Sequence, residues 1–464
     1  KPALLAILLA FPAQQALAAN CTWNPATGNW STASDWSCGI VPTGGLDTAI
    51  IAGGKVVTVN TAQSILNLTN SGGVNIDAFL LTLAGGGSTT NTGTINVGAG
   101  PNPNNAALQV AAGHNINNTG GVINISADSV LNQFGSTITG GTINTTGSGA
   151  LVAFNNGNNF LSGVALNGRL DLASNTGIER IVNGLTLGGP GVVNINSASL
   201  LTFEGTQNVA GTGTLNFGSA AGNRIQLEGA GTTTLAAGVV IRGQNGTIGS
   251  GQSFIGGANT LVNNGTISAD VAGGQITLAS AGGGGVTNNN LLEARNGATL
   301  NIQSVGVSQG ALGQISALNG STVLLNASSI TGGTLGTSGT GKLVATNNGN
   351  NFLNGVTLDG LLDIASSTGI ERITAGGMTL NGTINIGNSS ILAPQGNQTI
   401  GGTGSIVFAD ANASNRLNVE AGNLVIGSSV TVRGQTGFIG AQSFVGGAAT
   451  LTNNGTIQAD VAGG

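Results

Sequence analysis

Charged side chains are scarce in this sequence, so those that occur twice are the first candidates for chemistry. Only 6% of the 464 residues are charged, and a stretch that begins at Gly149 returns nearly verbatim from Gly341. Among the ten charged residues from Asp128 to Asp270, Asp128, Arg169 and Glu204 lose their charge in the second copy. The other seven keep it: Asp171 and Asp363, Glu179 and Glu371, Arg180 and Arg372, Arg224 and Arg416, Glu228 and Glu420, Arg242 and Arg433, Asp270 and Asp460.

Cleavage of a glycan is the reaction that retained carboxylates would serve. Glycoside hydrolases need two carboxylates flanking the scissile bond, and a calcium-assisted lyase needs several acids beside a basic residue. Here the acids stand singly, with Asp359 and Asp363 the closest pair. Glu179 and Arg180 are neighbours and would point to opposite faces of a strand. Sequence spacing does not test carboxylates that different turns bring together, so a β-helical polysaccharide lyase or glycoside hydrolase stays the alternative function.

Other chemistries find no support. The single histidine, His114, has no Ser in a Gly-x-Ser-x-Gly turn, and the repeated Gly-Gly-x-Gly-x-Asp calcium pattern is missing. Eleven basic residues are scattered through a chain of net charge -5, which gives no footprint for nucleic acid. We therefore expect no enzyme, no catalytic residue, no cofactor and no metal site.

The elements that would position these charges are short strands. Apolar residues alternate with polar ones, as in Leu66-x-Leu68, Ile123-x-Ile125 and Ile384-x-Ile386, and Gly-rich pairs between them supply the positive φ of sharp corners. One phrase returns at intervals of about 18 to 27 residues within clusters, as Gly93-Thr94-Ile95 and Gly382-Thr383-Ile384. This pattern predicts an all-β fold, a parallel right-handed β-helix. About 20 residues a turn would give some 22 turns and a rod of about 100 Å.

Asparagine gathers at the expected corners, as in the NNGNNF loop that ends at Phe160 and again at Phe352. Stacked Asn side chains can form ladders of amide hydrogen bonds along a solenoid. Laddering with buried Phe160 and Phe352 is the interpretation we favour for these loops. The alternative is contact with a glycan through Asn158, Phe160, Asn350 and Phe352.

Three tryptophans and both cysteines lie in the segment 20–60. A pair as close as Cys21 and Cys38 in an exported chain predicts a disulfide. Trp23, Trp30 and Trp36 suit a cap that closes the open end of a solenoid, since an uncapped first turn would expose apolar surface. The alternative is a platform on which sugar rings stack.

The opening motif resembles a known group. GNWSTASDWS is followed by Pro42, by Asp47 and apolar residues, and then by GGKVVTV. This order is similar to the start of bacterial β-strand-repeat surface proteins, which resemble autotransporter passengers and filamentous-haemagglutinin-type adhesins. The resemblance covers about forty residues. It implies a β-solenoid at the cell surface and no fixed catalytic residues.

The N-terminus predicts export. Lys1, an apolar run from Ala3 to Phe11 and then Ala16-Leu17-Ala18 match a secretory signal, with cleavage after Ala18. We expect a signal peptide at 1–18 whose true start is missing, a cap at 19–60 and a solenoid at 61–464. A block at about 120–311 would be duplicated from about 312 and cut off at 464. No later stretch reaches twenty apolar residues, so an anchor would lie beyond this C-terminus.

These patterns predict a structural or adhesive protein. We expect an exported, elongated stalk or adhesin, secreted or at the surface of a Gram-negative outer membrane. Repeated turns would contact glycans or host matrix through many weak sites at once. An ice-binding solenoid would need regular Thr-x-Thr ranks, which are not evident.

Overall fold

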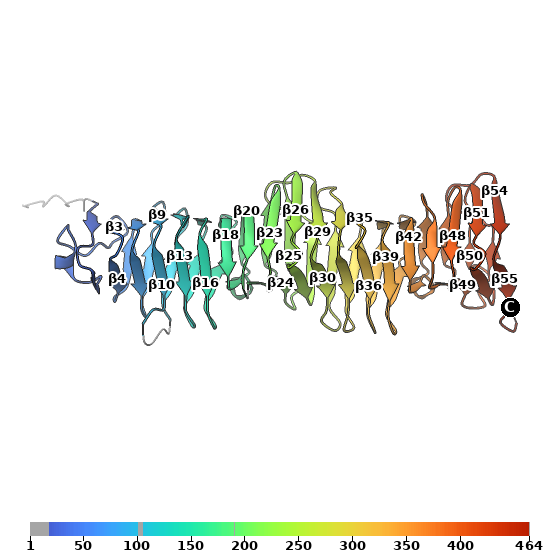
Figure 1. Ribbon diagram of the computed structural model, residues 1–464, viewed down its shortest axis with the longest axis horizontal. Coiled ribbons are helices and arrows are strands. Elements are labelled where there is room, and N and C mark those ends of the chain that lie inside the picture. The colour runs from blue at the N-terminus through green and yellow to red at the C-terminus, as the bar shows by residue number, and fades with distance from the viewer. Residues whose placement is uncertain (1–17, 101–104, 190, 464) are drawn as a thin grey trace, which may run out of the picture.

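Parallel strands stacked into a long rod make up almost all of the molecule (Figure 1). The structure is a computed structural model that describes residues 18–100, 105–189 and 191–463. The predicted signal peptide and most of its cleavage site lie outside these residues. Within the described part, no helix is long and apolar enough to span a membrane.

Three ladders of parallel strands run along the rod and form the three sides of each turn. Ladder A runs from β1 (Asn20–Thr22) to β55 (Thr456–Ala459), ladder B from β2 (Thr27–Asn29) to β53 (Phe438–Ile439), and ladder C from β5 (Gln63–Ile65) to β54 (Ala449–Asn453). Ladders A and B share the long strands β18 (Phe160–Asn167) and β20 (Ile178–Leu187). The fold is the predicted β-solenoid.

The turns are longer and fewer than the sequence predicted. Ladder C contains 18 strands in the described chain, which corresponds to about 18 turns. At about 4.8 Å a turn, the rod is about 85 Å long, so the prediction of 22 turns and 100 Å was too high. The reason is variable corner length, because the shift between paired residues grows from 17 at Val56 and Gly73 to 30 at Asn245 and Gln275.

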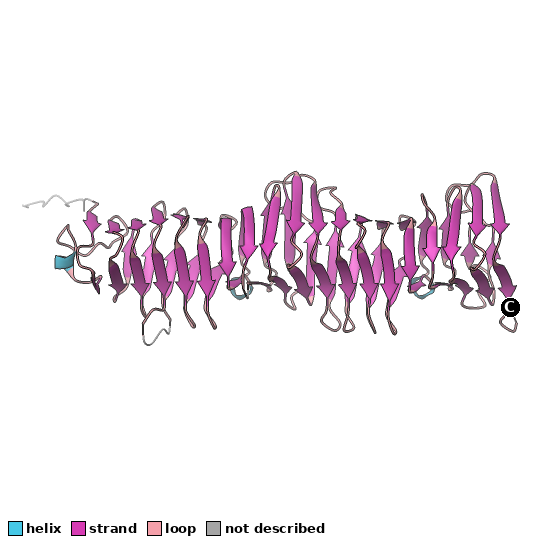
Figure 2. Ribbon diagram, viewed as in Figure 1, coloured by secondary structure: helices cyan, strands magenta, loops and turns pink. Residues whose placement is uncertain are grey.

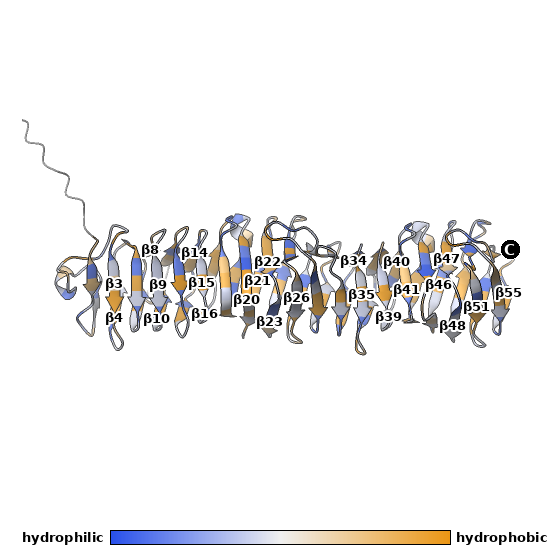
Figure 3. Ribbon diagram, turned by 90° about the horizontal axis from the view of Figure 1, so that it is seen from above, coloured by the Kyte–Doolittle hydropathy of each residue, from blue (hydrophilic) through white to orange (hydrophobic). Residues whose placement is uncertain are grey.

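The interior is filled by the inward half of each strand. In β10 (Thr94–Val97), Ile95 and Val97 are buried and their neighbours face outward. Apolar and polar residues alternate along the strands in the same way in Figure 3. Each fully buried Ile or Leu contributes about 1.5–3 kcal/mol, so a continuous column of them stabilises a chain that has few charges.

The glycine of the recurring Gly-Thr-Ile phrase is needed for close approach to the preceding turn, and at most of its occurrences it has no positive φ, Gly141 being an exception. A Cβ on Gly93 would lie 2.1 Å from the carbonyl oxygen of Gly72, and one on Gly382 would lie 2.0 Å from that of Gly360. Neither glycine has a positive φ. The phrase recurs because the chain enters each strand against the backbone of the preceding turn. The predicted positive φ is confirmed at other corner glycines, such as Gly54, Gly86 and Gly120, but not at Gly93 or Gly382.

Asparagine ladders occur at corners, as predicted, and also along a strand face. Asn263 donates to Asn288 at 2.9 Å, and Asn289 donates to Asn264 at 2.8 Å. A longer ladder on the outside of ladder B joins five turns, with successive amide bonds of 2.8 to 2.9 Å through Asn75, Asn96, Asn124, Asn144 and Asn167. It ends at Gly188, where a Cβ would lie 2.1 Å from the Asn167 Oδ1.

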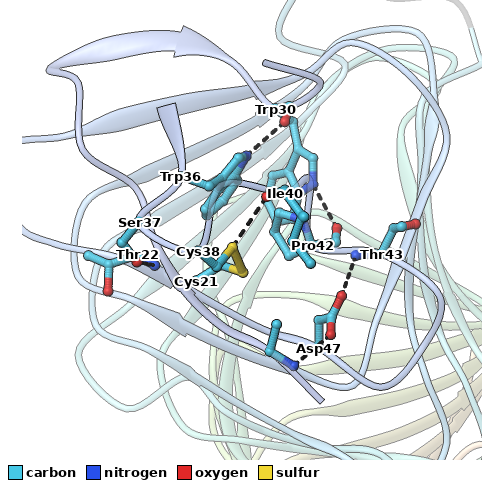
Figure 4. The surroundings of a disulfide bond; sticks show 11 residues. Cys21, Thr22, Trp30, Trp36, Ser37, Cys38, Ile40, Pro42, Thr43 and Asp47 are labelled. Atoms are coloured by element: carbon cyan, nitrogen blue, oxygen red, sulfur yellow. Dashed lines mark hydrogen bonds between the residues drawn. A yellow bond between two sulfur atoms is a disulfide. The ribbon is translucent and has the colours of Figure 1, made fainter. Parts of the chain in front are cut away.

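The N-terminal cap is built from the residues of the opening motif (Figure 4). Cys21 and Cys38 form the predicted disulfide. Trp36 packs edge-on against Trp23 and Trp30, with ring centroids 5.0 and 4.8 Å apart, and all three rings are at least 98% buried. No ring face is therefore open to a stacking sugar.

Two charged residues of the same motif tie the cap to the first turn. The Asp47 carboxylate accepts hydrogen bonds from the backbone N–H groups of Ala19 and Thr43, at 2.8 and 3.0 Å. Lys55 donates to the carbonyl oxygens of Trp23 and Asn24. The cap strands β1 and β2 pair with β3 (Thr48–Ile51) and β4 (Val56–Val59), so the segment 19–60 already holds the first strands of ladders A and B.

The duplicated block does not contain a whole number of turns. From Phe160 to Phe352 the chain passes through 25 ladder strands, because β18 and β20 each serve ladders A and B. This is eight turns plus one strand. Equivalent strands therefore change ladder: β20 joins ladder A through Glu179, whereas its counterpart β44 (Ile370–Ile373) belongs to ladder B.

Although equivalent strands belong to different ladders, the raised strands and loops of both copies lie on the same side of the rod. Figure 1 shows raised strands and loops around β26 (Gly231–Leu235) and β29 (Asn259–Asn263), and again around β51 (Gly422–Ile426) and β54, all on the upper side. The short 3-10 helices η2 (Ala173–Asn175) and η3 (Ala365–Ser367) both lie low on the rod in Figure 2. The twist of the stack thus offsets the extra strand.

Candidate functional site

The NNGNNF loops combine one exposed amide with one structural amide. Asn158 and Asn350 are exposed, as a ligand contact requires. Asn159 is buried, accepts a 2.5 Å hydrogen bond from the Gly135 N–H and donates to two carbonyl oxygens. Asn351 donates to two carbonyl oxygens in the same way, each at 3.1 Å. The inner Asn residues therefore hold their own loops and form no ladder with another Asn.

The phenylalanines of these loops lie on the outside of the rod, not in the core as predicted. Phe160 is half-buried beneath the guanidinium of Arg180, its partner in the next turn, with the Cζ 4.3 Å from the ring centroid. A second ring, Phe254, covers the other face of the guanidinium at 4.1 Å. Arg180 also donates to the Gly157 carbonyl oxygen at 2.9 Å, which ties it to the Asn-rich loop.

The second copy repeats this stack. Arg372 lies between Phe352 and Phe444, with centroid distances of 4.5 and 4.9 Å, and donates to the Gly349 carbonyl oxygen at 2.7 Å. Each cation–π contact of this kind contributes about 0.5–2 kcal/mol, depending on how far it is desolvated. We call each set of Asn-rich loop, arginine and two phenylalanines a stacked-arginine module.

A buried glutamate holds the loop that brings in the second ring. The Glu228 carboxylate accepts hydrogen bonds from the backbone N–H groups of Ser253, Phe254 and Ile255, at 2.5 to 2.8 Å. Such charge-assisted bonds are about twice as strong as neutral ones. Removing the carboxylate would free the loop that carries Phe254.

Glu420 holds the corresponding loop of the second copy. It accepts hydrogen bonds from the backbone N–H groups of four consecutive residues, Ser443 to Gly446. Burial alone would raise the pKa of Glu420, but these four donors hold it below the ordinary value. The sequence analysis missed both covering loops, although the near repetition of QSFIGGANTL at 252–261 as QSFVGGAATL at 442–451 could have shown them.

The two modules differ at one charge. In the first, the Nε of Arg180 donates to the carboxylate of Glu204, which stands beside Glu228 on the neighbouring strand. In the second, Gln395 takes the place of Glu204. The paired carboxylates of Glu204 and Glu228 come from residues 24 positions apart, which sequence spacing alone did not reveal. Each is already bound, Glu204 to Arg180 and Glu228 to the covering loop.

The adjacent glutamates point the other way, into the core. Glu179 and Glu371 are fully buried, and neither carboxyl oxygen of either residue finds a hydrogen-bond partner in the described chain. Burial raises the pKa of both groups well above the ordinary value. The backbone N–H of the following residue lowers the pKa, but by less than burial raises it. The raised pKa favours the protonated, uncharged form of both residues.

The remaining retained acids form ion pairs with cations. Asp171 bonds to Arg169 at 2.5 Å, and its counterpart Asp363 bonds to Lys342 at 3.0 Å, so the acid stays while its partner moves to another strand. Burial tends to raise the pKa of Asp171, but Arg169, Ser174 and the Ala173 N–H bring it below the ordinary value. Asp270 and Asp460 bond to Arg242 and Arg433, at 2.6 and 2.9 Å.

Asp171 and Arg169 line a shallow groove of about 360 Å³ with Asn194, Asn196 and Asn216. The sequence neighbours Asp359 and Asp363 belong to ladders C and A, and each bonds to a different residue. His114 is buried between Thr89 and the Ala84 carbonyl oxygen. Among the described residues, no three His, Cys, Asp or Glu side chains gather as metal ligands.

Comparison with known proteins finds similar solved structures but no similar sequence. No family model matches the chain, and no curated protein matches it. A solved structure described as a TibC-catalysed, hyper-glycosylated TibA fragment is similar over 75% of this chain and 95% of that fragment, with 15% identity and a TM-score of 0.26.

Proposed function

We propose that this chain is an exported, elongated stalk that adheres through contacts repeated along its length. The observation that carries the proposal is the pair of stacked-arginine modules, which recur eight turns and one strand apart. The strands β29 and β54, which directly follow the two covering loops, lie on the same side of the rod (Figure 1). A continuous parallel solenoid keeps the two modules at a fixed separation, so both can engage one surface. Two weak contacts held in this way gain affinity through effective concentration.

The contact groups that we propose are the exposed amides beside each stack. Asn158 and Asn350 are exposed and lie two residues before the half-buried rings of Phe160 and Phe352, and amides near aromatic groups suit the hydroxyls and apolar faces of sugars. Glycans or host matrix are therefore the proposed partners. The disulfide of the cap supports export, because such bonds persist in oxidising compartments. We propose a location outside the cell, secreted or at the surface.

We also propose that the chain has no catalytic activity. The retained carboxylates of both copies are occupied: in ion pairs, in loop N–H bonds or, for Glu179 and Glu371, inside an apolar core. A fully buried acid with no route to a substrate serves neither as general acid nor as nucleophile. These assignments support a structural role for the charges that the duplication retained.

A binding screen tests the adhesive role. The intact protein is applied to immobilised glycans and extracellular matrix proteins, beside variants N158R, N350R and the double variant. We expect a binder whose signal falls about tenfold in each single variant and is lost in the double variant. T90R, an exposed change on β9 (Ser88–Asn91), controls for the added charge. No binder, or an unaltered signal in the double variant, would contradict the proposal, and depolymerised glycan would favour the enzyme.

A further inference from the structure

Two buried donors in the second module have no partner. The Nε of Arg372 and the Nε2 of Gln395 are both buried, and neither forms a hydrogen bond with any described residue. An unsatisfied buried donor costs about 1–3 kcal/mol, and more when the group is charged. An acceptor from outside the chain would relieve this cost for both donors at once.

The first module shows which chemical group fits this place. There the Nε of Arg180 donates to the carboxylate of Glu204, at the position that Gln395 occupies in the second copy. Both guanidinium groups have the same pose, because each lies between two phenylalanine rings and donates to the glycine carbonyl of its Asn-rich loop. The Arg372 Nε consequently points where a carboxylate lies in the first copy.

The backbone that carries residues 204 and 395 is also held alike. Gln207 donates to the Glu204 carbonyl oxygen and accepts from the Gly184 N–H. Gln398 does the same for Gln395 and Gly377, at 2.6 and 2.8 Å. The two sites therefore share a frame and differ in the side chain that would supply the acceptor.

We propose that the second module binds a carboxylate group from solution, such as that of a uronic acid, between Arg372 and Gln395. The guanidinium Nε–H and the Gln395 amide N–H each donate to one oxygen of the planar anion, as a bidentate pair. The first module cannot do so, because Glu204 occupies the same place. The duplicated block thus carries one open and one internally filled copy of a single anion site.

The neighbouring Glu420 does not prevent this. Its backbone bridges to that of Gln395, as the backbone of Glu204 pairs with that of Glu228. In the first module the carboxylates of Glu204 and Glu228 stand side by side, so the frame tolerates a second negative group once arginine balances it. Access comes from the turn after Gln395, where Gly396 and Asn397 are exposed and Gln395 itself is only half-buried.

This inference does not rest on adhesion, and its test uses single substitutions in the full chain. Calorimetric titration with sodium glucuronate should give one site per chain in the wild type, two in E204Q and none in Q395E. Glucose should not bind, and acetate should bind at the same site. Q303E adds the same charge at an exposed residue of β34 (Thr299–Gln303) and should leave binding unchanged.

The resonance of the Arg372 Nε–H in selectively labelled protein gives a second readout that does not depend on stoichiometry. Glucuronate should shift it in the wild type and leave it unmoved in Q395E, and thermal melts confirm that each variant is folded. Unchanged stoichiometry in E204Q, retained binding in Q395E, or sulfate binding as tightly as glucuronate would overturn the proposal. A neutral glycan that binds the rod while glucuronate does not would reject this site and leave the adhesive function standing.

Discussion

The two copies of the duplicated block keep their frame and differ in how they balance charge. Both stack an arginine between two phenylalanines, pin a covering loop with a glutamate and bury a second glutamate in the core. They differ at Glu204 and Gln395, and in the cation that meets Asp171 or Asp363. The residues that the two copies share hold the module together, whereas those that differ change how its charge is balanced.

Removal of the loop anchor should have the largest effect, and it should be equal in both copies. E228A and E420A each delete three or four charge-assisted hydrogen bonds, which we expect to cost about 3 kcal/mol of local stability. Amide hydrogen exchange of residues 253–255 or 443–446 should then accelerate about a hundredfold, while the other copy stays protected. Protection that persists in E420A would show that the second loop is held differently.

The anchor of the second copy should also respond to acid. Because the folded pKa of Glu420 lies below its unfolded value, its contribution is complete above the ordinary Glu pKa and is lost as pH falls through the lowered folded value. Exchange at 443–446 should therefore accelerate below about pH 4. In E420Q this acid step should be absent, and a step that remains would assign it to another group.

Replacement of the buried glutamates should stabilise the rod by about 1–3 kcal/mol each at high pH. Their folded pKa lies well above the unfolded value, so stability falls as pH rises above the unfolded pKa, and the loss grows until the folded pKa is reached. E179Q and E371Q should unfold like the wild type at pH 4 and at a higher temperature at pH 8. Equal melting shifts at both pH values would contradict the assignment.

An aromatic pair is present in the first copy only, and its replacement should have a smaller effect on stability. Phe134 and Phe154 stack with centroids 4.0 Å apart, where the second copy has Asn326 and Thr346 joined by a 3.3 Å hydrogen bond. The double change F134N/F154T imports the second arrangement and should cost about 1 kcal/mol. A denaturant titration that follows the first block would detect this loss. A gain in stability would show that the Asn–Thr hydrogen bond stabilises this corner more than the aromatic stack does.

Removal of the cation that pairs with Asp171 or Asp363 should have the smallest effect on stability. Arg169 and Lys342 are 39% and 35% exposed, so R169A and K342A should each cost about 0.5 kcal/mol or less, with the difference vanishing in 1 M salt. Thermal melts at low and high salt measure this. A larger, salt-independent cost in one variant alone would show that its cation packs as well as pairs.

Strand alternation, corner asparagines and cysteine spacing were enough to predict the solenoid, the cap and the disulfide. Turn number was overestimated, because corner length varies by more than ten residues and the alternation of Leu and Ile does not record it. Only part of each module could be predicted from the sequence. Asn158 and Phe160 were candidates, but Phe254 comes from a loop four turns later in the chain. Stacking brings Glu204 beside Arg180 from 24 positions away, which one-dimensional spacing cannot express.

The measurement that tests the central claim most directly is dissociation from a surface at two ligand densities. Intact protein bound to the glycan or matrix ligand found by the screen should leave a dense surface at least tenfold more slowly than a sparse one, because two modules engage together. N158R and N350R should each abolish that difference. A dissociation rate that is independent of density in the wild type would contradict a rod that adheres through repeated contacts.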